Sequence, residues 1–461
     1  MKPILQQAVR LNASSATIRI ATVLAGFGTN QIIRLGMSII MTRLLAPDLM
    51  GVMVIINTLR TGIELLTDVG LGANIVRHPQ GRTPEFLRTA WTVQAARGLM
   101  LTLIFLALSP LVARLYHRPE LAGLLAASSL LFTITGIKWP ALMVLQKDQR
   151  VLERVRFDIV TNMLFTIISI ALAWWLRSTW SLVFALLAGE TMITALSFFV
   201  PIGISPRLAF NRAYFREMIH FGKWIFVGSA LYFAAISFDK LYLSATMTLF
   251  ALGIYNVGRT LSDAIGQAIL QLGEFIVFPT IAAFRGEKDE LTRKLRAARR
   301  RMLVPAALGL ATVAAFSPLL VFTLYDSRYH SAALVAPALM VAVWPTLLSI
   351  IAEMVMRGIG KSAPGASGNA AKLATLVAAM PIGFLKGGML GALLAMNLAE
   401  WLRYAAIASA ARRSGISFLR DDARLTLLFA SVAGGLIMLV AHGWLGIGMA
   451  DIRQWAGSFT H

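Results

Sequence analysis

Long apolar segments alternate with short polar turns along nearly the whole chain. A helix that crosses a bilayer needs about 20 mostly apolar residues, and windows of this kind recur from residue 18 to residue 442 of the 461. We expect an all-α polytopic membrane protein. The pattern predicts about thirteen spans, at 18–43, 49–76, 88–115, 121–145, 157–177, 180–202, 224–247, 250–282, 302–325, 331–356, 366–385, 388–410 and 424–442.

Composition and charge support this interpretation. The chain is 57% apolar and only 14% charged, whereas soluble domains carry about 25% charged residues. The net charge of +21 could indicate a nucleic-acid-binding protein. With the N-terminus in the cytoplasm, however, most of the 43 Lys and Arg residues fall in alternate, cytoplasmic loops, which is the positive-inside rule of membrane proteins. We therefore expect no nucleic-acid partner.

The residues that bind metals or act as nucleophiles are sparse. The chain has no cysteine, and its six histidines are scattered without metal-ligand spacing. No phosphate-binding loop of the G-x-x-x-x-G-K-[ST] type is present. We expect no metal site, no cofactor and no direct use of ATP.

Weak internal similarity indicates a duplicated architecture. A shift of 202 residues aligns Gly26 with Gly228 and Gly51 with Gly253, although so few identities leave chance as an alternative. An even number of spans between the copies preserves orientation and predicts a parallel repeat. We expect two six-helix bundles around a central cleft, followed by one or two C-terminal helices.

The expected domains follow this repeat. The segment 208–221 is either an amphipathic helix at the membrane interface or an ordinary basic loop. The sequence predicts four regions. An N-terminal bundle occupies 1–205, and the region 206–301 contains the interfacial helix, the start of the second bundle and a basic linker at 285–301. The rest of the second bundle occupies 302–412, and an extra span and tail occupy 413–461.

Several spans carry polar residues at helical spacing, on one face of each helix. An ionisable side chain at membrane depth is costly and by default indicates a transport pathway. Within two of these spans, Arg60–Glu64 and Arg259–Asp263 have i,i+4 spacing and could instead be ion pairs that hold helices together. The candidates are the cations Arg34, Arg60, Arg97, Lys240 and Arg259, the amides Asn30, Gln31, Asn57 and Gln267, and the acids Glu64, Asp239 and Asp263.

Three short motifs connect these spans to a known family. They are R-L-L-A-P-D-L-M-G at 43–51, T-D-V-G-L at 67–71 and F-G-K-W at 221–224. Over about residues 15–410 the chain resembles the Wzx-type polysaccharide flippases, which are part of the multidrug/oligosaccharidyl-lipid/polysaccharide (MOP) exporter superfamily. Members of that superfamily have two six-helix bundles around a central cleft and are not enzymes.

The resemblance implies a function. Such a protein would move an undecaprenyl-pyrophosphate-linked oligosaccharide across the bacterial inner membrane by alternating access, driven by a proton or sodium gradient. The cations would bind the pyrophosphate, the amides would bind sugar hydroxyls, and the acids would couple the driving ion. A polysaccharide polymerase and a chain-length regulator would be its partners. A lipid II flippase and a multidrug cation antiporter remain alternatives, whereas a polymerase or ligase would need a larger outer loop.

Overall fold

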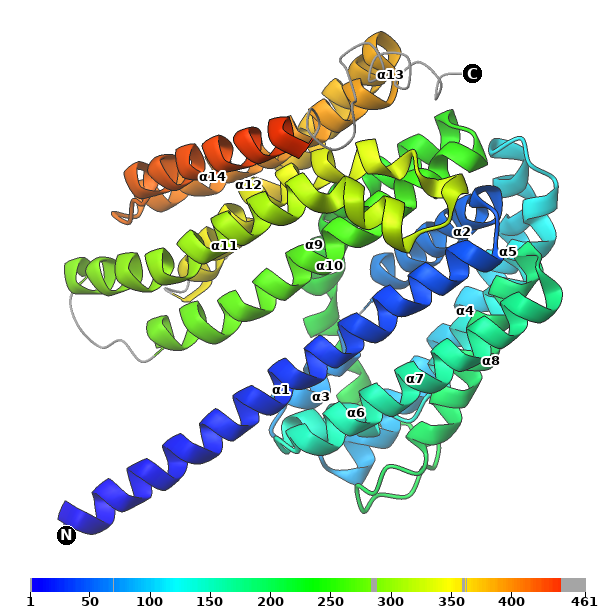
Figure 1. Ribbon diagram of the computed structural model, residues 1–461. Helices are drawn as coiled ribbons and strands as arrows, with labels where there is room; N and C mark the ends of the chain where they lie inside the picture. Colours follow the sequence, from blue (N-terminus) through cyan, green and yellow to red (C-terminus); the bar gives the residue numbers. More distant parts are fainter. Residues whose placement is uncertain (1, 69, 283–287, 359–360, 362, 441–461) are drawn as a thin grey trace. The chain divides into compact units, whose positions relative to one another are not determined.

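The computed structural model describes residues 2–68, 70–282, 288–358, 361 and 363–440. Within these ranges the regular structure is helical throughout (Figure 1). The chain forms two compact units. Unit 1 contains Met1–Leu45 and Ile56–Ala230, and unit 2 contains Ala46–Ile55 and Leu231–His461.

Each predicted span lies mainly on helical residues, so the all-α membrane fold is confirmed. Among the described residues, nine helices are long and apolar enough to cross a membrane, or ten if the bent pair α5 and α6 is one span. The helices are α1 (Lys2–Leu44), α2 (Pro47–Leu66), α3 (Leu71–Arg77), α4 (Pro84–Leu115), α5 (Glu120–Gly136), α6 (Ala141–Lys147), α7 (Val151–Leu176), α8 (Thr179–Ser197), α9 (Arg212–Thr246), α10 (Leu249–Ala282), α11 (Lys288–Leu324), α12 (Ala332–Gly358), α13 (Ala363–Arg413) and α14 (Leu419–Val440).

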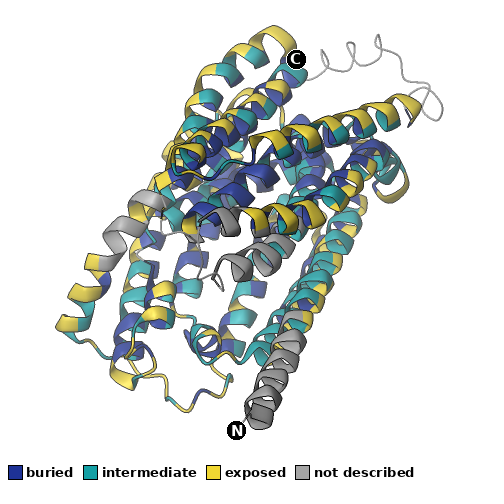
Figure 2. Cartoon of the chain, turned by 90° about the vertical axis from the view of Figure 1, so that its left-hand side faces the viewer, coloured by how far each residue is buried: buried dark blue, intermediate teal, exposed yellow. Residues whose placement is uncertain are grey.

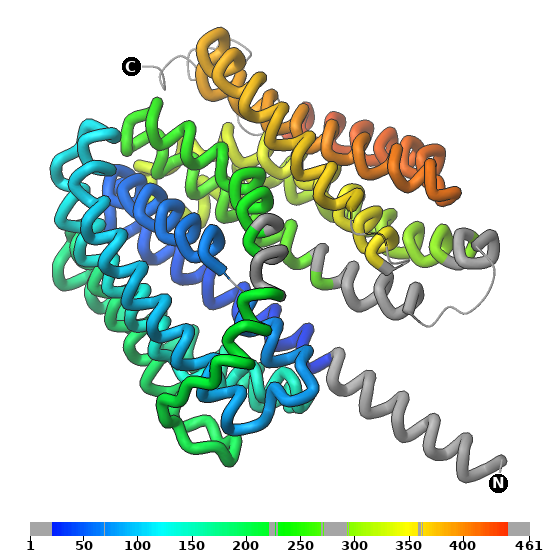
Figure 3. Tube along the Cα trace, turned by 180° about the vertical axis from the view of Figure 1, so that it is seen from behind, coloured from blue at the N-terminus to red at the C-terminus, as the bar shows by residue number. Residues whose placement is uncertain are grey.

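Unit 1 is a helical bundle in which α4 packs on α5, α5 on α8, α8 on α7, and α7 on α1. The tube trace shows α4, α5, α7 and α8 side by side (Figure 3). Exposed and buried residues alternate along the helices (Figure 2), and many of the exposed residues are large and apolar, such as Leu103, Ile167 and Trp175. A surface of this kind suits a lipid environment rather than water.

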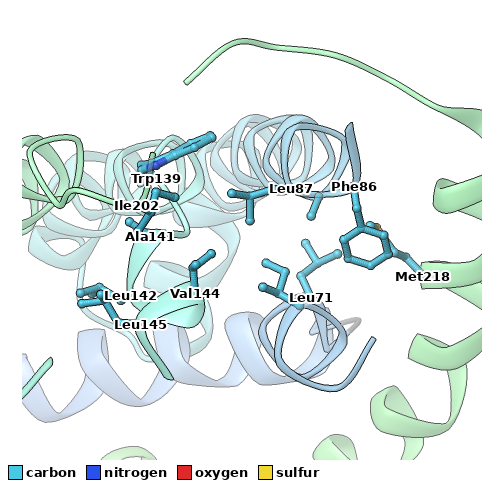
Figure 4. Close-up of a cluster of buried hydrophobic side chains, with 12 residues drawn as sticks. Leu71, Phe86, Leu87, Trp139, Ala141, Leu142, Val144, Leu145, Ile202 and Met218 are labelled. Atoms are coloured by element: carbon cyan, nitrogen blue, oxygen red, sulfur yellow. The ribbon is translucent and has the colours of Figure 1, made fainter. Parts of the chain in front are cut away.

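A core of buried side chains closes one end of unit 1 (Figure 4). It joins the short helices α3 and α6 to α4 and includes Phe86 and Trp139. Met218, from the first turns of α9, is fully buried in the same core. The helix that was expected over 208–221 begins at Arg212 and is the start of α9, where Glu217 Oε1 lies within hydrogen-bond distance of His78 Nε2, at 2.9 Å. The F-G-K-W motif side chains at 221–224 and the first residues of the basic linker, 285–287, lie outside the described residues, as does the tail after 440.

Unit 2 contains a helix that doubles back. Helix α13 has non-helical backbone angles at Gly387 and Gly388, and Lys372 Nζ lies 2.5 Å from Glu400 Oε1. In a straight helix these residues would be about 42 Å apart, at 1.5 Å per residue. Helix α13 is therefore two antiparallel arms, which correspond to the predicted spans 366–385 and 388–410. Around this hairpin, α12 packs on α13, α10 and α11, and α11 packs on α14.

The turn between α11 and α12 is also well defined. The Asp326 carboxylate accepts hydrogen bonds from the Arg328 side chain at 2.7 Å and from the Arg328 backbone N–H at 3.0 Å. These hydrogen bonds, with the one from the side chain contributing most, lower the pKa of Asp326 below its usual value. The connection is thus a short folded turn rather than a domain.

Two glycines allow α2 and α10 to cross closely within unit 2. A Cβ at Gly51 would overlap the carbonyl oxygen of Leu249, and a Cβ at Gly253 would overlap the carbonyl oxygen of Pro47. The contact is reciprocal, because each glycine meets the residue four positions before the other. These are the two glycines that the 202-residue shift aligned. Helix α2 then continues past Ile55 into unit 1.

Candidate functional site

A polar cluster in unit 1 is built from α2 and α4. Arg60 Nη1 lies 2.9 Å from Glu64 Oε1, one turn further along α2. From α4, Arg97 Nη2 donates to the carbonyl oxygen of Glu64 at 2.6 Å and to Thr67 Oγ1 at 2.8 Å. All four side chains are half-buried. The two guanidinium groups therefore lie with the Glu64 carboxylate, and the Asp68 carboxylate also interacts electrostatically with Arg97.

The sequence after α2 explains why Arg97 binds there. Gly70 has a left-handed backbone (φ 63°), and its N–H donates to the Asp68 carboxylate at 2.9 Å. This turn ends α2 at Leu66 and leaves the last carbonyl groups of the helix without helical partners. Arg97 supplies a partner to one of them, the carbonyl of Glu64. The T-D-V-G-L motif thus forms the break in the predicted span 49–76.

A second ion pair in unit 1 joins the α5–α6 connection to α8. Lys138 Nζ lies 3.1 Å from Glu190 Oε2, and both side chains are about a quarter exposed. Gln94 on α4 donates to the carbonyl oxygen of Thr135 at 2.9 Å. Neither Lys138 nor Glu190 was among the candidates from the sequence, because each stands alone in its own span without a polar stripe.

The candidates on α1 lie along its described second half. The Asn162 side chain on α7 donates to Asn30 Oδ1 at 2.9 Å and fixes α1 against α7. Arg34 is exposed, and Gln31 is half-buried. On α2, Asn57 is half-buried one turn before the cluster of Arg60 and Glu64.

A polar cluster in unit 2 is built from α9 and α10. Asp239 is 3% exposed and accepts a hydrogen bond from the Tyr255 hydroxyl. Arg259 lies between two carboxylates, with Nη1 3.5 Å from Asp239 Oδ2 and Nε 3.1 Å from Asp263 Oδ1. Lys240 is half-buried beside Asp239. Of the remaining candidates, Gln267 is exposed on α10.

The structure confirms the ion-pair interpretation of both i,i+4 pairs, Arg60–Glu64 and Arg259–Asp263. It also brings together residues from different helices, namely Arg97 with Glu64 and Asp239 with Arg259. An arginine that forms an ion pair within its own helix can still bind a ligand, because its guanidinium group has five N–H donors and the ion pair uses only some of them. The roles of these residues in binding substrate or coupling an ion therefore remain predictions.

A further charged group in unit 2 was missed from the sequence. It connects α12 to both arms of α13 and consists of Glu353, Lys372, Glu400 and Arg403. The available signal was the Gly387–Gly388 pair. A hairpin turn there places a residue about fourteen positions before it opposite one about fourteen positions after it. No group of three or more His, Cys, Asp or Glu side chains that could hold a metal ion occurs in the described ranges.

Comparison with known proteins identifies the family. The sequence model of the family described as "Polysaccharide biosynthesis protein" matches residues 40–334, which is more than half of the chain. The search of curated sequences gives no match.

Three solved structures share the fold. "Lipid II flippase MurJ, inward closed conformation" has a TM-score of 0.71 at 11% identity and covers 94% of this chain and 95% of that one. An inward-facing multidrug resistance MATE family transporter of the MOP superfamily has a TM-score of 0.60 at 14% identity, covering 87% and 95%. The eukaryotic MATE transporter AtDTX14 has a TM-score of 0.58 at 11% identity, covering 91% and 98%.

At these identities the structural likeness shows the fold alone. The family match shows that the chain is a polysaccharide biosynthesis protein. The transporter fold, the candidate spans and the family agree with the resemblance noted from the motifs. The chain belongs to the family described as "Polysaccharide biosynthesis protein", and it is a multi-pass helical membrane protein with the fold of the MOP transporters.

Proposed function

We propose that the protein moves an undecaprenyl-pyrophosphate-linked oligosaccharide repeat unit across the bacterial inner membrane, from the cytoplasmic face outward, for exopolysaccharide, capsule or O-antigen assembly. The family description supports a role in polysaccharide biosynthesis. Every such repeat unit is carried on a lipid with an anionic headgroup. The proposal needs a cationic site at membrane depth and a route for a lipid tail.

The observation that carries the proposal is the presence of two half-buried guanidinium groups in the unit 1 cluster. Arg60 pairs with the Glu64 carboxylate, whereas Arg97 donates to the backbone carbonyl oxygen of Glu64 and to Thr67 Oγ1. The nearby ion pair, Lys138–Glu190, is neutral overall. The planar arginine fork matches phosphate oxygens and binds them in a bidentate manner. This arrangement favours a pyrophosphate over an organic cation, which a multidrug antiporter would bind.

The other candidates have roles that fit this substrate. Arg34, Lys240 and Arg259 are further cations for the headgroup, and Asn30, Gln31, Asn57 and Gln267 can bond to sugar hydroxyls. Glu64, Asp239 and Asp263 are the proposed coupling carboxylates for a proton or sodium gradient. The N-terminus is cytoplasmic in this proposal, and a polymerase and a chain-length regulator receive the product. No resident cofactor is required.

Lipid II transport is the second candidate function. The structure of the lipid II flippase MurJ has the same fold with a TM-score of 0.71, and lipid II also carries a pyrophosphate on a polyprenyl chain. The unit 1 cluster would serve either substrate, because the two lipids differ in their sugars. Genetics separates them, since loss of lipid II transport stops cell-wall growth and loss of repeat-unit transport does not.

The test is deletion of the gene with complementation by variants. We expect spheroplasts of the deletion strain to accumulate inward-facing lipid-linked oligosaccharide and to lack surface polymer. Wild-type protein restores the polymer, whereas Arg34→Ala and Arg60→Ala lower transport by about tenfold to a hundredfold, the loss of one charge-assisted contact of about 1.5–3 kcal/mol. Arg156→Ala, which removes an exposed guanidinium near the start of α7, is the matched control.

Two results would contradict the proposed substrate, and a third would contradict the proposed binding site. Normal surface polymer in the deletion strain, together with new sensitivity to cationic drugs, would assign the protein to the multidrug branch. Arrest of cell-wall growth with accumulation of lipid II would favour the second candidate. Equal activity of Arg60→Ala and Arg156→Ala, at equal membrane levels, would remove the unit 1 cluster from the binding site.

A further inference from the structure

The connection between α8 and α9 (residues 198–211) is held against the start of α4 in unit 1. The backbone N–H of Ala209 donates to Thr92 Oγ1 at 3.1 Å, and the backbone N–H of Asn211 donates to Thr89 Oγ1 at 3.2 Å. Both threonines are on α4. The position of the connection along α4 is therefore fixed by hydrogen bonds.

The connection ends in a capped helix. Asn211 Oδ1 accepts a hydrogen bond from the backbone N–H of Ala213 at 2.8 Å, and Asn211 Nδ2 donates to Glu85 Oε1 at 2.6 Å. Two turns into α9, Met218 is fully buried in the core of unit 1. The segment 207–216 is thus fixed on both sides, and its exposed side chains form a defined surface.

The segment 207–216 exposes apolar and basic side chains together. Leu208 and Phe210 are 66% and 59% exposed. Large apolar side chains that are exposed in this way, on a segment fixed to the protein, indicate a surface that is covered by something other than water. The exposed basic side chains of the same segment are Arg207, Arg212 and Arg216.

The three arginines have no acidic partner. In the described part of the chain, no ion pair or side-chain hydrogen bond is found for Arg207, Arg212 or Arg216. Other arginines at the same end of unit 1 are neutralised by ion pairs, namely Arg82–Asp148, Arg150–Glu153 and Arg154–Asp158. The positive charge of the segment 207–216 is therefore available to an external anion.

Distances along α4 place the connection at the edge of the hydrocarbon layer. The exposed apolar side chains of α4 extend from Leu99 to Leu115. Thr92 and Thr89, which hold the connection, lie 23 and 26 residues before Leu115, about 34 and 39 Å along the helix. The hydrocarbon layer is about 30 Å thick, and the headgroups extend the bilayer to about 40–45 Å. Measured from Leu115, the connection therefore lies at the level of the headgroups.

Phospholipid headgroups match this surface in charge and in polarity. A planar guanidinium group binds phosphate oxygens through two parallel hydrogen bonds. Each basic residue near an anionic membrane surface strengthens binding by about fivefold. Leu208 and Phe210 can enter the boundary between headgroups and acyl chains, as the apolar face of an interfacial helix does. A soluble anion would satisfy the arginines but leave both apolar side chains in water.

We propose that the segment 207–216 binds anionic phospholipids, with the phosphate groups at its three arginines and the acyl chains against Leu208 and Phe210. In the proposed orientation these lipids belong to the cytoplasmic leaflet. Because the connection is bonded to α4, bound lipid holds this end of unit 1 at a fixed depth in the membrane. The inference does not depend on which substrate is transported.

The first test measures the thermal unfolding of the full-length protein in nanodiscs. Wild type should unfold about 2–5 °C higher when phosphatidylglycerol is mixed with phosphatidylcholine than in phosphatidylcholine alone, because a ligand of the folded state raises the midpoint. Arg207→Gln/Arg212→Gln/Arg216→Gln should have the wild-type midpoint in phosphatidylcholine but lose this rise. A wild type without the rise, or a triple variant that keeps it, would overturn the proposal.

A matched triple variant removes the same charge elsewhere. Arg412, Arg413 and Arg424 of unit 2 are also exposed, and none of them has an exposed large apolar side chain directly beside it in the described sequence. We expect Arg412→Gln/Arg413→Gln/Arg424→Gln to keep the rise with phosphatidylglycerol. An equal loss in both triple variants would mean that net charge, and not the segment 207–216, determines the effect.

Two further measurements separate a lipid from a soluble anion. Inorganic phosphate added to phosphatidylcholine nanodiscs should not raise the wild-type midpoint, and a rise equal to that with phosphatidylglycerol would replace the proposed lipid by a soluble ion. Leu208→Ser/Phe210→Ser keeps every charge and should reduce the rise with phosphatidylglycerol. An undiminished rise in this variant would contradict contact between the two side chains and the acyl chains.

Crosslinking locates the bound lipid. Phosphatidylglycerol with a photoactivatable diazirine on its headgroup is incorporated into the nanodiscs, and labelled peptides are identified by mass spectrometry. Crosslinks in wild type should concentrate in residues 205–219 and decrease by about fivefold for each arginine that is replaced. Crosslinks that concentrate in other parts of the chain, or that persist at full yield in Arg207→Gln/Arg212→Gln/Arg216→Gln, would place the lipid elsewhere and refute the proposal.

Discussion

Replacing Asp422 by asparagine is expected to destabilise the protein strongly, whereas the same change at the neighbouring Asp421 is not. The Asp422 carboxylate accepts both of its bonds to Arg299 from Nη2, at 2.6 and 2.9 Å, and a third from the Tyr404 hydroxyl at 2.7 Å. The two charged side chains are only 3% and 5% exposed. The guanidinium of Arg299 also lies 4.3 Å from the Phe418 ring centre.

The expected size follows from burial. Removing one partner of a buried ion pair costs about 3–5 kcal/mol, because the other charge is left unpaired away from water. Asp421 is 44% exposed and pairs with Arg296 at 3.3 Å, and exposed pairs contribute about 0–1 kcal/mol. Thermal unfolding in detergent, followed by size-exclusion chromatography, should show a midpoint about 5–10 °C lower for Asp422→Asn and little change for Asp421→Asn.

A double variant checks the reason for the effect. Arg299→Met/Asp422→Leu removes both charges, and apolar replacement of a complete buried pair is often neutral. We expect it to be more stable than Asp422→Asn. Equal midpoints for the two aspartate variants would show that burial does not set the strength of these contacts, and that α11 and α14 are held together by apolar packing alone.

Adding one methyl group at Gly51 or at Gly253 is the second change with a large expected effect. Each Cβ would overlap a backbone carbonyl oxygen of the facing helix, and a backbone atom cannot rotate away as a side chain can. Overpacking of this kind costs about 1–3 kcal/mol or more. Gly51→Ala and Gly253→Ala should therefore each lower the thermal midpoint, whereas Gly28→Ala and Gly36→Ala, where no atom lies within 4 Å of the new Cβ, should not.

The double variant gives a sharper result. Both overlaps occur at one crossing of α2 and α10, so a single outward shift of the helices relieves both. Contacting sites of this kind are not additive. We expect Gly51→Ala/Gly253→Ala to cost clearly less than the sum of the single variants. Additive costs would mean that the two glycines act independently and that the close crossing is not one contact.

Much of the fold could be predicted from the sequence because its signals are local. Spans follow from runs of apolar residues, and the two i,i+4 pairs follow from spacing within one helix. The break in the predicted span 49–76 also had a local signal, since Asp68 and Gly70 favour a turn. The doubled-back α13 was expected as the two spans 366–385 and 388–410, and the structure places the turn between them at Gly387 and Gly388.

The contacts between helices could not be predicted in the same way. In a soluble helix the apolar stripe shows which face is buried, but in a membrane the lipid is as apolar as the core. Lys372 is the one charged residue of its predicted span, and Glu400 has only Arg403 beside it, so neither has a polar stripe that predicts which way it faces. Asp239 and Arg259 were both candidates, yet their pairing depends on how α9 is rotated against α10. These pairs require the register between helices, which only the structure provides.

The crossing of α2 and α10 has the form of an isologous dimer contact, in which residue i of one copy touches residue j of the other and j touches i. Here both helices belong to one chain. The first residues of α2 lie in unit 2, and the rest of α2 lies in unit 1. A gene cut between the two repeats would therefore separate residues 46–55 from the unit they complete. Each half expressed alone would lack part of its packing, and only co-expression of the two fragments would restore it.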